Sequence, residues 1–318
     1  MIRRLILAAA SVLALHGVAA ASEAPRVAVT IKPVHALATA LMDGTGKAPE
    51  LVYAGAASPH VAALKPSQVA MVLDADVLFM IGDGYERLME RAVNQRVAAK
   101  GKTVVLAEAQ GVKTMPYRQG ANFEAHVHAG EEEAAGQGAD DHDHETGVDP
   151  HVWLDPENAR AIARVMATEL AADDPDHAAL YAKNLASVEA GLDVLSNELG
   201  SILAPAKGKP FIVFHDAYHY LENRYGLTAA GTIVLNPEST PGAERLKQVR
   251  DRIVALNAQC VFAEPQFEVG YVRTVIEGTP AKPGKLDPLG AAIAPGPDAY
   301  REMMLDLAHA MADCLAGK

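Results

Sequence analysis

The sequence has only two cysteines, a deficit of positive charge and, beyond its first residues, no long apolar run. Its 318 residues include 28 Lys and Arg against 40 Asp and Glu, a formal net charge of −12 at pH 7. This balance argues against nucleic-acid binding, which uses basic surface stripes. No later stretch approaches the roughly 20 apolar residues that a transmembrane helix needs. The acidity suits a protein that handles cations, although solubility alone explains it equally well.

The N-terminus has the pattern of an export signal. Residues 1–4 are basic, residues 5–15 are almost wholly apolar, and residues 18–21 offer small side chains for cleavage. We therefore expect residues 1–21 to be a signal peptide and the mature chain to lie in the periplasm; a retained N-terminal anchor is the alternative. No cysteine lies near the cleavage region, so we do not expect a lipoprotein.

The two cysteines, Cys260 and Cys314, are far apart in the sequence. In an oxidising compartment an even pair is interpreted first as a disulfide. Cys314 lies in a predicted C-terminal helix, residues 300–315, so the bond would attach this helix to the second half of the chain and stabilise it by roughly 3–4 kcal/mol. Metal binding by the two thiolates is the alternative, but a lone separated pair lacks the close spacing of thiolate sites.

The order of predicted elements indicates an α/β fold with two lobes, each containing a mainly parallel sheet flanked by helices. We expect an N-terminal lobe over residues 22–175 and a C-terminal lobe over residues 205–318. The first lobe has predicted strands at 26–31, 51–53, 77–81 and 103–106, and predicted helices at 34–42, 65–73, 85–99 and 157–170. The second has predicted strands at 211–214, 230–235 and 261–263, and predicted helices at 241–256 and 269–277.

A long helix is predicted between the lobes, over residues 176–204. Its apolar residues recur in steps of three and four, as one face of a helix requires: Leu185, Val188, Leu192, Leu195, Leu199 and Ile202. About 27 residues would span roughly 40 Å at 1.5 Å per residue. We interpret this segment as a rigid linker that resists hinge bending; an ordinary packing helix is the alternative.

Residues 118–146 interrupt the alternation of strands and helices. They are rich in Gly, Glu, Asp and His and have almost no large apolar residues, so we expect a mobile loop. Four of its histidines form a possible accessory site that takes up metal weakly, since ordering the loop costs conformational entropy: His126, His128, His142 and His144. A solvated insertion without a role is the alternative.

Three other histidines lie in short polar segments beside predicted strands. His60 follows the second strand, His151 stands in the segment Asp149–Pro156, and His215 directly follows the strand at 211–214. Ligands of parallel α/β sheets bind beyond the carboxyl ends of the strands. His60 and His215 occupy such ends, one in each lobe. Neutral imidazoles brought together from distant segments form a first-row metal site that suits zinc, so we predict a metal site in the cleft between the lobes.

A carboxylate would complete a tetrahedral site around three imidazoles. Asp287 is the candidate for the fourth ligand, and Glu264 is either an alternative ligand or a nearby acid. Asp155 and Asp216 could fix imidazole tautomers by a hydrogen bond to the ring nitrogen that does not bind the metal, and either could equally cap a helix.

Four motifs together resemble those of the ZnuA-type zinc-binding proteins of bacterial ABC importers: Gly55–His60, Asp149–Pro156, Phe214–Tyr218 and Leu286–Gly290. The resemblance covers essentially the whole mature chain. It implies two α/β lobes joined by a rigid long helix, with His60, His151 and His215 as ligands and Asp287 as a ligand or nearby acid. The cysteine pair and the histidine-rich loop are similar to those of zinc-binding members. Manganese-binding relatives typically carry glutamate in place of His215, which favours zinc here. Some relatives have a glutamate where this chain has Pro59.

The resemblance implies a solute-binding protein, not an enzyme, that delivers Zn²⁺ to a membrane permease and its ATPase. We expect a monomer without nucleic-acid partners. The alternatives are a manganese-binding homologue, a periplasmic zinc buffer or metallochaperone, and a zinc hydrolase, since three protein ligands with an open position are also catalytic geometry. No nucleophile–base pair or His-Glu-x-x-His helix is evident in the sequence, which disfavours the hydrolase.

Overall fold

The computed structural model describes residues 23–82, 84–99, 101–118, 120–123, 147–235, 237 and 239–317. The predicted signal peptide and the four accessory histidines, His126, His128, His142 and His144, lie outside these residues. Within the described ranges, no helix combines the length and apolarity needed to cross a membrane.

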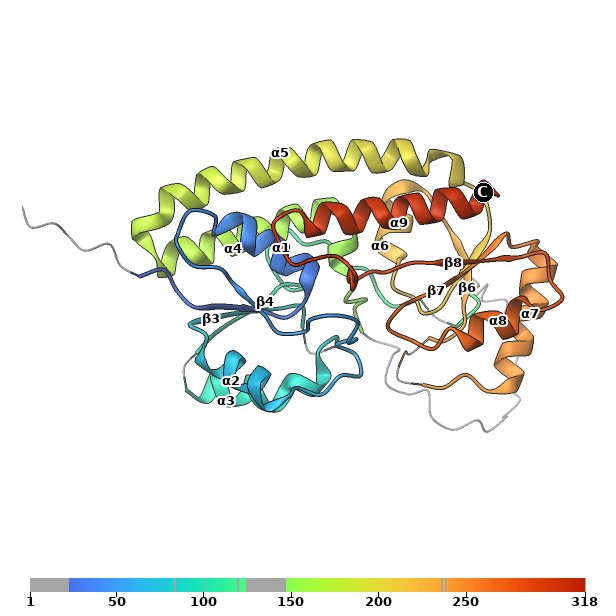
Figure 1. Cartoon of the computed structure of the whole chain (residues 1–318), viewed down its shortest axis with the longest axis horizontal. Coiled ribbons are helices and arrows are strands. Elements are labelled where there is room, and N and C mark those ends of the chain that lie inside the picture. Colours follow the sequence, from blue (N-terminus) through green and yellow to red (C-terminus); the bar gives the residue numbers. More distant parts are fainter. Residues whose placement is uncertain are drawn as a thin grey trace, which may run out of the picture.

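The first lobe contains a parallel sheet with the strand order β2-β1-β3-β4. Its strands are β1 (Val27–Val29), β2 (Glu50–Leu51), β3 (Val77–Met80) and β4 (Lys102–Val105). One face packs against α1 (Lys32–Leu41) and α4 (Pro156–Asp173), and the other against α2 (Pro66–Asp74) and α3 (Glu90–Ala98) (Figure 1). Because side chains alternate along a strand, Val27 and Val29 face the first pair of helices and Ala28 the second.

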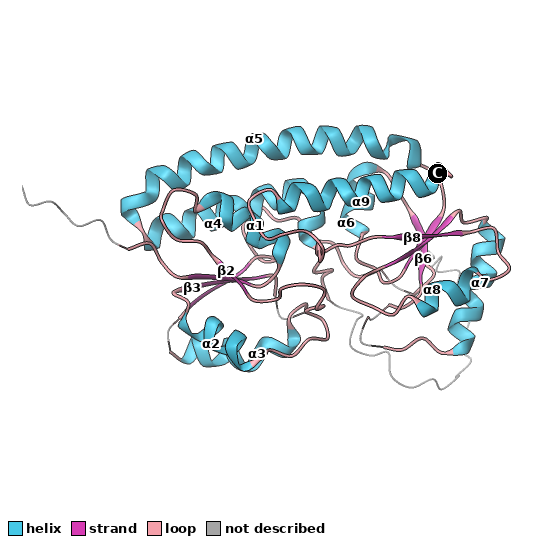
Figure 2. Cartoon of the chain, in the orientation of Figure 1, coloured by secondary structure: helices cyan, strands magenta, loops and turns pink. Residues whose placement is uncertain are grey.

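The second lobe contains another parallel sheet, with the order β6-β5-β7-β8. Its strands are β5 (Phe211–Val213), β6 (Ala229–Thr232), β7 (Cys260–Ala263) and β8 (Lys282–Lys285). Helices α7 (Ala243–Leu256) and α8 (Gly270–Ile276) cover one face, and α9 (Ala299–Leu315) and the short α6 (His219–Tyr225) lie on the other side. Figure 2 shows the two sheets at opposite ends of the molecule. Two parallel sheets flanked by helices confirm the predicted fold class.

The predicted long helix is α5, Ala178–Leu203, which has 26 residues. It runs along one side of the molecule over both lobes (Figure 1), and packs against α1 and α4 of the first lobe and α6 and α9 of the second. One continuous cluster of buried apolar residues extends from β1 through α5 to α9. Since the lobes share this apolar core, large relative movements of the lobes are disfavoured.

A disulfide joins Cys260 in β7 to Cys314 in α9, as predicted. It fixes the last helix to the second sheet. Because α9 also packs against α1 and α5, the bond lies within the framework that connects the two lobes.

Helix α6 and strand β8 escaped prediction, and one predicted helix is divided. Residues 85–99 form a 3-10 turn, Arg87–Met89, followed by α3. The sequence of β8, Lys-Pro-Gly-Lys, has no apolar residue, but the strand lies at a sheet edge, where proline is tolerated. A Cβ at Gly284 would lie about 2.4 Å from the Phe262 ring, so only glycine lets this strand approach β7.

Candidate metal centre

The three predicted histidines come together between the lobes. His60 lies in the loop after β2, His151 directly before the 3-10 turn Val152–Leu154, and His215 two residues after the end of β5. One ring nitrogen from each lies within 4.8 Å of the others. The side chains are largely buried, since the three residues are 9%, 3% and 4% exposed. Segments 91 and 64 residues apart thus supply one compact group of imidazoles.

The spacing of the ring nitrogens matches that of zinc ligands. The Nε2 atom of His151 lies 3.3 Å from Nε2 of His60 and 3.2 Å from Nε2 of His215. Nitrogens held at about 2.0–2.1 Å from a tetrahedral zinc ion are about 3.3 Å apart. Two neutral imidazoles cannot both present Nε2 lone pairs to each other at this distance without repulsion. The arrangement therefore suits a cation placed between the rings.

Two buried carboxylates set the orientation of two of the rings. The Nδ1 atom of His151 lies 2.7 Å from Oδ1 of Asp149, and Nδ1 of His215 lies 2.8 Å from Oε1 of Glu264. An ionised carboxylate only accepts hydrogen bonds, so each Nδ1 donates, and in the neutral rings each Nε2 keeps its lone pair. Carboxylates behind histidine ligands are a common arrangement of metal sites, where they fix the tautomer and raise the basicity of the ligand.

Burial and neighbouring charges shift the pKa values of these groups. Burial, reinforced by His215, lowers the pKa of His151 well below 6.5, which favours the neutral form that binds metal. Burial also acts to lower the pKa of His215, but Glu264 and the other nearby carboxylates outweigh it and raise this pKa above 6.5. Burial raises the pKa of Asp149 to about 7. A cation at the site would compete with protons on His215 in particular.

Aromatic side chains surround the imidazole group. The Tyr85 ring packs edge-on against His60, with centroids 4.5 Å apart, and Trp153 lies 5.3 Å from His151. The Phe267 ring lies 5.5 Å from His215. These rings shield the nitrogen atoms from bulk water, and a lower local dielectric strengthens the attraction between a bound cation and the nearby carboxylates.

Helix α6 connects the segments that carry His151 and His215. The Tyr220 hydroxyl donates to the carbonyl of Asp149 at 2.7 Å and accepts from the backbone N–H of Met115 at 2.9 Å. Arg224 donates to both carboxylate oxygens of Asp155, at 2.8 and 2.7 Å. Since α6 begins four residues after His215, these contacts fix the two histidine segments to each other across the lobes.

The chain that leads into the histidine-rich segment is fixed to the second lobe. The Arg118 guanidinium donates to the carboxylates of Asp216 and Glu222 and lies 3.8 Å from the centre of the Phe123 ring. The carbonyl of Ala121 accepts from the backbone N–H of Thr232, at the edge strand β6. The described residues at the start of the loop predicted over 118–146 are thus held in place by the second lobe.

The other acids predicted near the site have defined partners. Asp287 Oδ1 accepts from Gln266 Nε2 at 2.8 Å, and Asp287 is not among the described residues whose ligand atoms gather with the histidines. Asp155 caps α4 by accepting from Glu157 N–H, and Asp216 pairs with Arg118. The tautomer-fixing acids are therefore Asp149, which sequence reasoning missed, and Glu264. The Asp149-Pro-His151 spacing is the feature that could have pointed to Asp149, since its carboxylate also accepts from the backbone N–H of His151.

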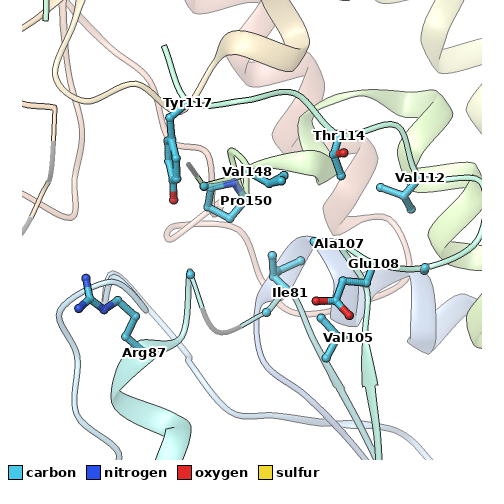
Figure 3. Close-up of a pocket in the computed structure, with 14 residues that line it drawn as sticks. Ile81, Arg87, Val105, Ala107, Glu108, Val112, Thr114, Tyr117, Val148 and Pro150 are labelled. Carbon is cyan, nitrogen blue, oxygen red and sulfur yellow. The ribbon is translucent and has the colours of Figure 1, made fainter. Parts of the chain in front are cut away.

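A cavity of about 690 Å³ lies beside the imidazole group. In Figure 3, Tyr117, Val148 and Pro150 lie above it and Ile81 and Glu108 below it. It reaches the segment of His151 through Pro150, but none of the three histidines lines it. The candidate cation position is therefore the small space between the imidazoles, and not this cavity.

Comparisons with known proteins agree on one family. The chain matches the family model described as zinc-uptake complex component A, periplasmic, over residues 27–314. The high-affinity zinc uptake system protein ZnuA of Brucella suis is 42% identical over 329 residues, covering 98% of each chain. The protein of that name from Paracoccus denitrificans is 36% identical over 325 residues, covering 99% of each.

Solved structures share the fold. A crystal structure of ZnuA matches with a TM-score of 0.74 at 26% identity, covering 92% of this chain and 99% of that one. The periplasmic zinc-binding protein TroA from Treponema pallidum matches with a TM-score of 0.75 at 16% identity, covering 92% of this chain and 99% of that one.

Proposed function

The chain belongs to the ZnuA family of periplasmic zinc-uptake components, and we propose that it binds Zn²⁺ as cargo and delivers it to the membrane permease of an ATP-driven importer. The observation that carries the proposal is the spacing of the three Nε2 atoms, 3.2 and 3.3 Å from the central one, which suits zinc. The names of the relatives support the same cargo.

In this proposal, His60, His151 and His215 bind the ion through Nε2. Asp149 and Glu264 hold two of the rings in the binding tautomer and partly balance the charge of the ion. A water molecule takes the fourth position, or Asp287 does so where it leaves its present hydrogen-bond partners. Three imidazoles favour zinc over manganese, which prefers oxygen ligands, so the manganese-binding alternative is less consistent with this ligand set.

The periplasm is the proposed location, and the permease with its ATPase the proposed partner, because the family model describes a periplasmic component of an uptake complex. The protein would act as a monomer. His126, His128, His142 and His144 remain a proposed weak accessory site. A zinc buffer or metallochaperone would use the same cleft without a permease. Stimulation of the reconstituted transporter's ATPase by the zinc-loaded protein separates import from buffering, since a buffer would not stimulate it.

A zinc hydrolase fits the site less well. Such an enzyme needs a general base near the open metal position. Glu264 is a candidate for this base, but its Oε1 atom accepts from Nδ1 of His215 on the side of the ring away from Nε2. We propose that the protein is not an enzyme.

The test is zinc titration of the mature protein and of His151→Ala and His215→Ala variants. Each substitution should weaken zinc binding by about tenfold or more, since an imidazole ligand contributes at least as much as the groups that support it. His309→Ala is the matched control because His309 is exposed on α9, away from the site. Unchanged zinc affinity in a folded His151 or His215 variant would remove that residue from the proposed site.

A further inference from the structure

Lys32 is a buried cation that reaches from the first lobe to the second. It is the first residue of α1 and is only 4% exposed. Its Nζ atom donates to the backbone carbonyls of Gly290, Ala291 and Ile293, the last two at 3.1 and 2.6 Å. Burial lowers the pKa of Lys32, while the Asp287 carboxylate acts in the opposite direction. An ammonium group taken out of water is costly unless hydrogen bonds replace its hydration, and here three carbonyls do so.

Two of the carbonyls that Lys32 contacts, those of Gly290 and Ala291, belong to the turn that carries Asp287, and the third, that of Ile293, follows the turn by two residues. In this turn, residues 287–291, the Asp287 carboxylate accepts from the backbone N–H of Leu289 at 3.2 Å and of Ala291 at 2.6 Å. Gly290 has a φ of +60°, a left-handed conformation that glycine adopts without strain. Gln266 adds a third hydrogen bond, at 2.8 Å. Asp287 is thus held by three donors and lies outside the group of ligand atoms that the histidines form, and two of the donors are available only while the turn is closed.

A second residue of the first lobe holds the same turn. The indole N–H of Trp153 donates to the carbonyl of Pro288 at 2.9 Å, and the Tyr300 hydroxyl donates to the carbonyl of Trp153 at 2.8 Å. Trp153 is fully buried and follows His151 by two residues. The turn is therefore anchored from the first lobe at both ends, by Trp153 at Pro288 and by Lys32 from Gly290 to Ile293.

We propose that Lys32, together with Trp153, is a specificity-determining latch that keeps the turn closed and so withholds the Asp287 carboxylate from the bound ion. The inference rests on the proposed function, because it concerns which cations the three-histidine site accepts. With the latch closed, the protein offers imidazoles and at most a water to the ion, which suits zinc. With the latch open, a hard anionic oxygen becomes available, which suits manganese.

The experiment measures zinc and manganese affinities by competitive titration of the mature full chain. Lys32→Gln cannot bridge three carbonyls and should loosen the turn. We expect the ratio of zinc affinity to manganese affinity to fall by about tenfold, the lower end of the effects seen when groups that support metal ligands are changed. In the double variant Lys32→Gln/Asp287→Asn the ratio should return towards the wild-type value, because the added carboxylate is then missing.

Lys285→Gln is the matched control. Lys285 is exposed at the end of β8, two residues before Asp287 but outside the turn, so its loss removes the same charge without opening the latch. Its ratio should equal that of the wild type. If the ratio of zinc affinity to manganese affinity falls as much in Lys285→Gln as in Lys32→Gln, the loss of a positive charge explains the effect, and the latch would be rejected.

A folded Lys32→Gln variant with an unchanged ratio would overturn the inference, as would a lowered ratio that persists in the double variant with Asp287→Asn. If Lys32→Gln does not fold, Trp153→Phe removes the other anchor of the turn. This variant must lower the ratio of zinc affinity to manganese affinity, and adding Asp287→Asn must restore the ratio. Otherwise the inference fails. A wild-type protein without a tight zinc site would overturn the proposed function as well, whereas tight zinc binding with no response to these substitutions would overturn the latch alone.

Discussion

Replacing Glu264 by glutamine tests how the carboxylates that accept from the Nδ1 atoms of the imidazoles contribute to cation binding. Glu264 Oε1 lies 2.8 Å from Nδ1 of His215 and holds the ring with Nε2 free to bind. Glutamine keeps the shape but loses the charge, and its amide can also donate to Nδ1 and so favour the wrong tautomer. Loss of such a partner weakens metal binding by about 10- to 100-fold. This corresponds to about 1.4–2.8 kcal/mol.

The pH dependence gives this prediction a distinctive sign. The carboxylate of Glu264 raises the pKa of His215 against the effect of burial, so in the wild type protons compete with zinc from a pH above 6.5 downwards. In Glu264→Gln the pKa of His215 falls, and proton competition begins at a lower pH. The difference in zinc affinity between wild type and variant should therefore be largest near pH 8 and should narrow as the pH falls through 6.

The assay is zinc titration of both proteins at several pH values between 6 and 8, with thermal unfolding to show that the variant is folded. Glu268→Gln serves as control, since Glu268 is an exposed acid four residues further along the chain. Equal affinity of wild type and Glu264→Gln at pH 8 would refute the role of Glu264. A loss of affinity that is the same at every pH would refute its effect on His215.

Three further predictions concern stability. Tyr220→Phe leaves the backbone N–H of Met115 without its acceptor and should lower the free energy of unfolding by about 1–3 kcal/mol in urea; an unchanged value would mean that α6 does not fix the His151 segment. Replacing both Cys260 and Cys314 by serine should lower it by about 4 kcal/mol in the chain-entropy model, for a sequence separation of 54, and a loss well below 1 kcal/mol would contradict this. Burial raises the pKa of Glu86 from 4.5 to about 7, although Thr30, Ile81 and Gly82 donate to its carboxylate. The contribution of Glu86 to the free energy of unfolding is therefore complete below pH 4.5. This contribution falls as the pH rises through about 7, and the total loss is up to about 3 kcal/mol. The stability of wild type relative to Glu86→Gln should accordingly fall between pH 5 and pH 8, and a difference independent of pH would show that Glu86 does not titrate in this way.

The fold was predictable where the sequence has strong local patterns. Parallel strands in both lobes follow from short apolar runs such as Val77–Met80 and Phe211–Val213, and α5 follows from its apolar periodicity. The β8 strand has no such pattern because its place in the sheet depends on its approach to β7. Helix α6 has only seven residues, too few for a periodic pattern to identify it.

The candidate site was predictable in its ligands and less so in the residues around them. His60 and His215 follow strands of different sheets, and ligands of parallel α/β sheets bind beyond the carboxyl ends of the strands. The partners of these histidines depend on tertiary packing. Glu264 is 49 residues from His215, and Lys32 is 258 residues from Gly290, so no local pattern connects them. A lysine at a helix start is normally exposed, and only the folded arrangement of the two lobes shows that this one is buried.

The most direct test of the three-histidine site is the position of zinc in crystals of the mature protein, located by anomalous scattering at the zinc absorption edge. We predict one fully occupied zinc ion, about 2.0–2.1 Å from the Nε2 atoms of His60, His151 and His215. A zinc ion bound elsewhere at full occupancy, with these three nitrogens unliganded, would contradict the account.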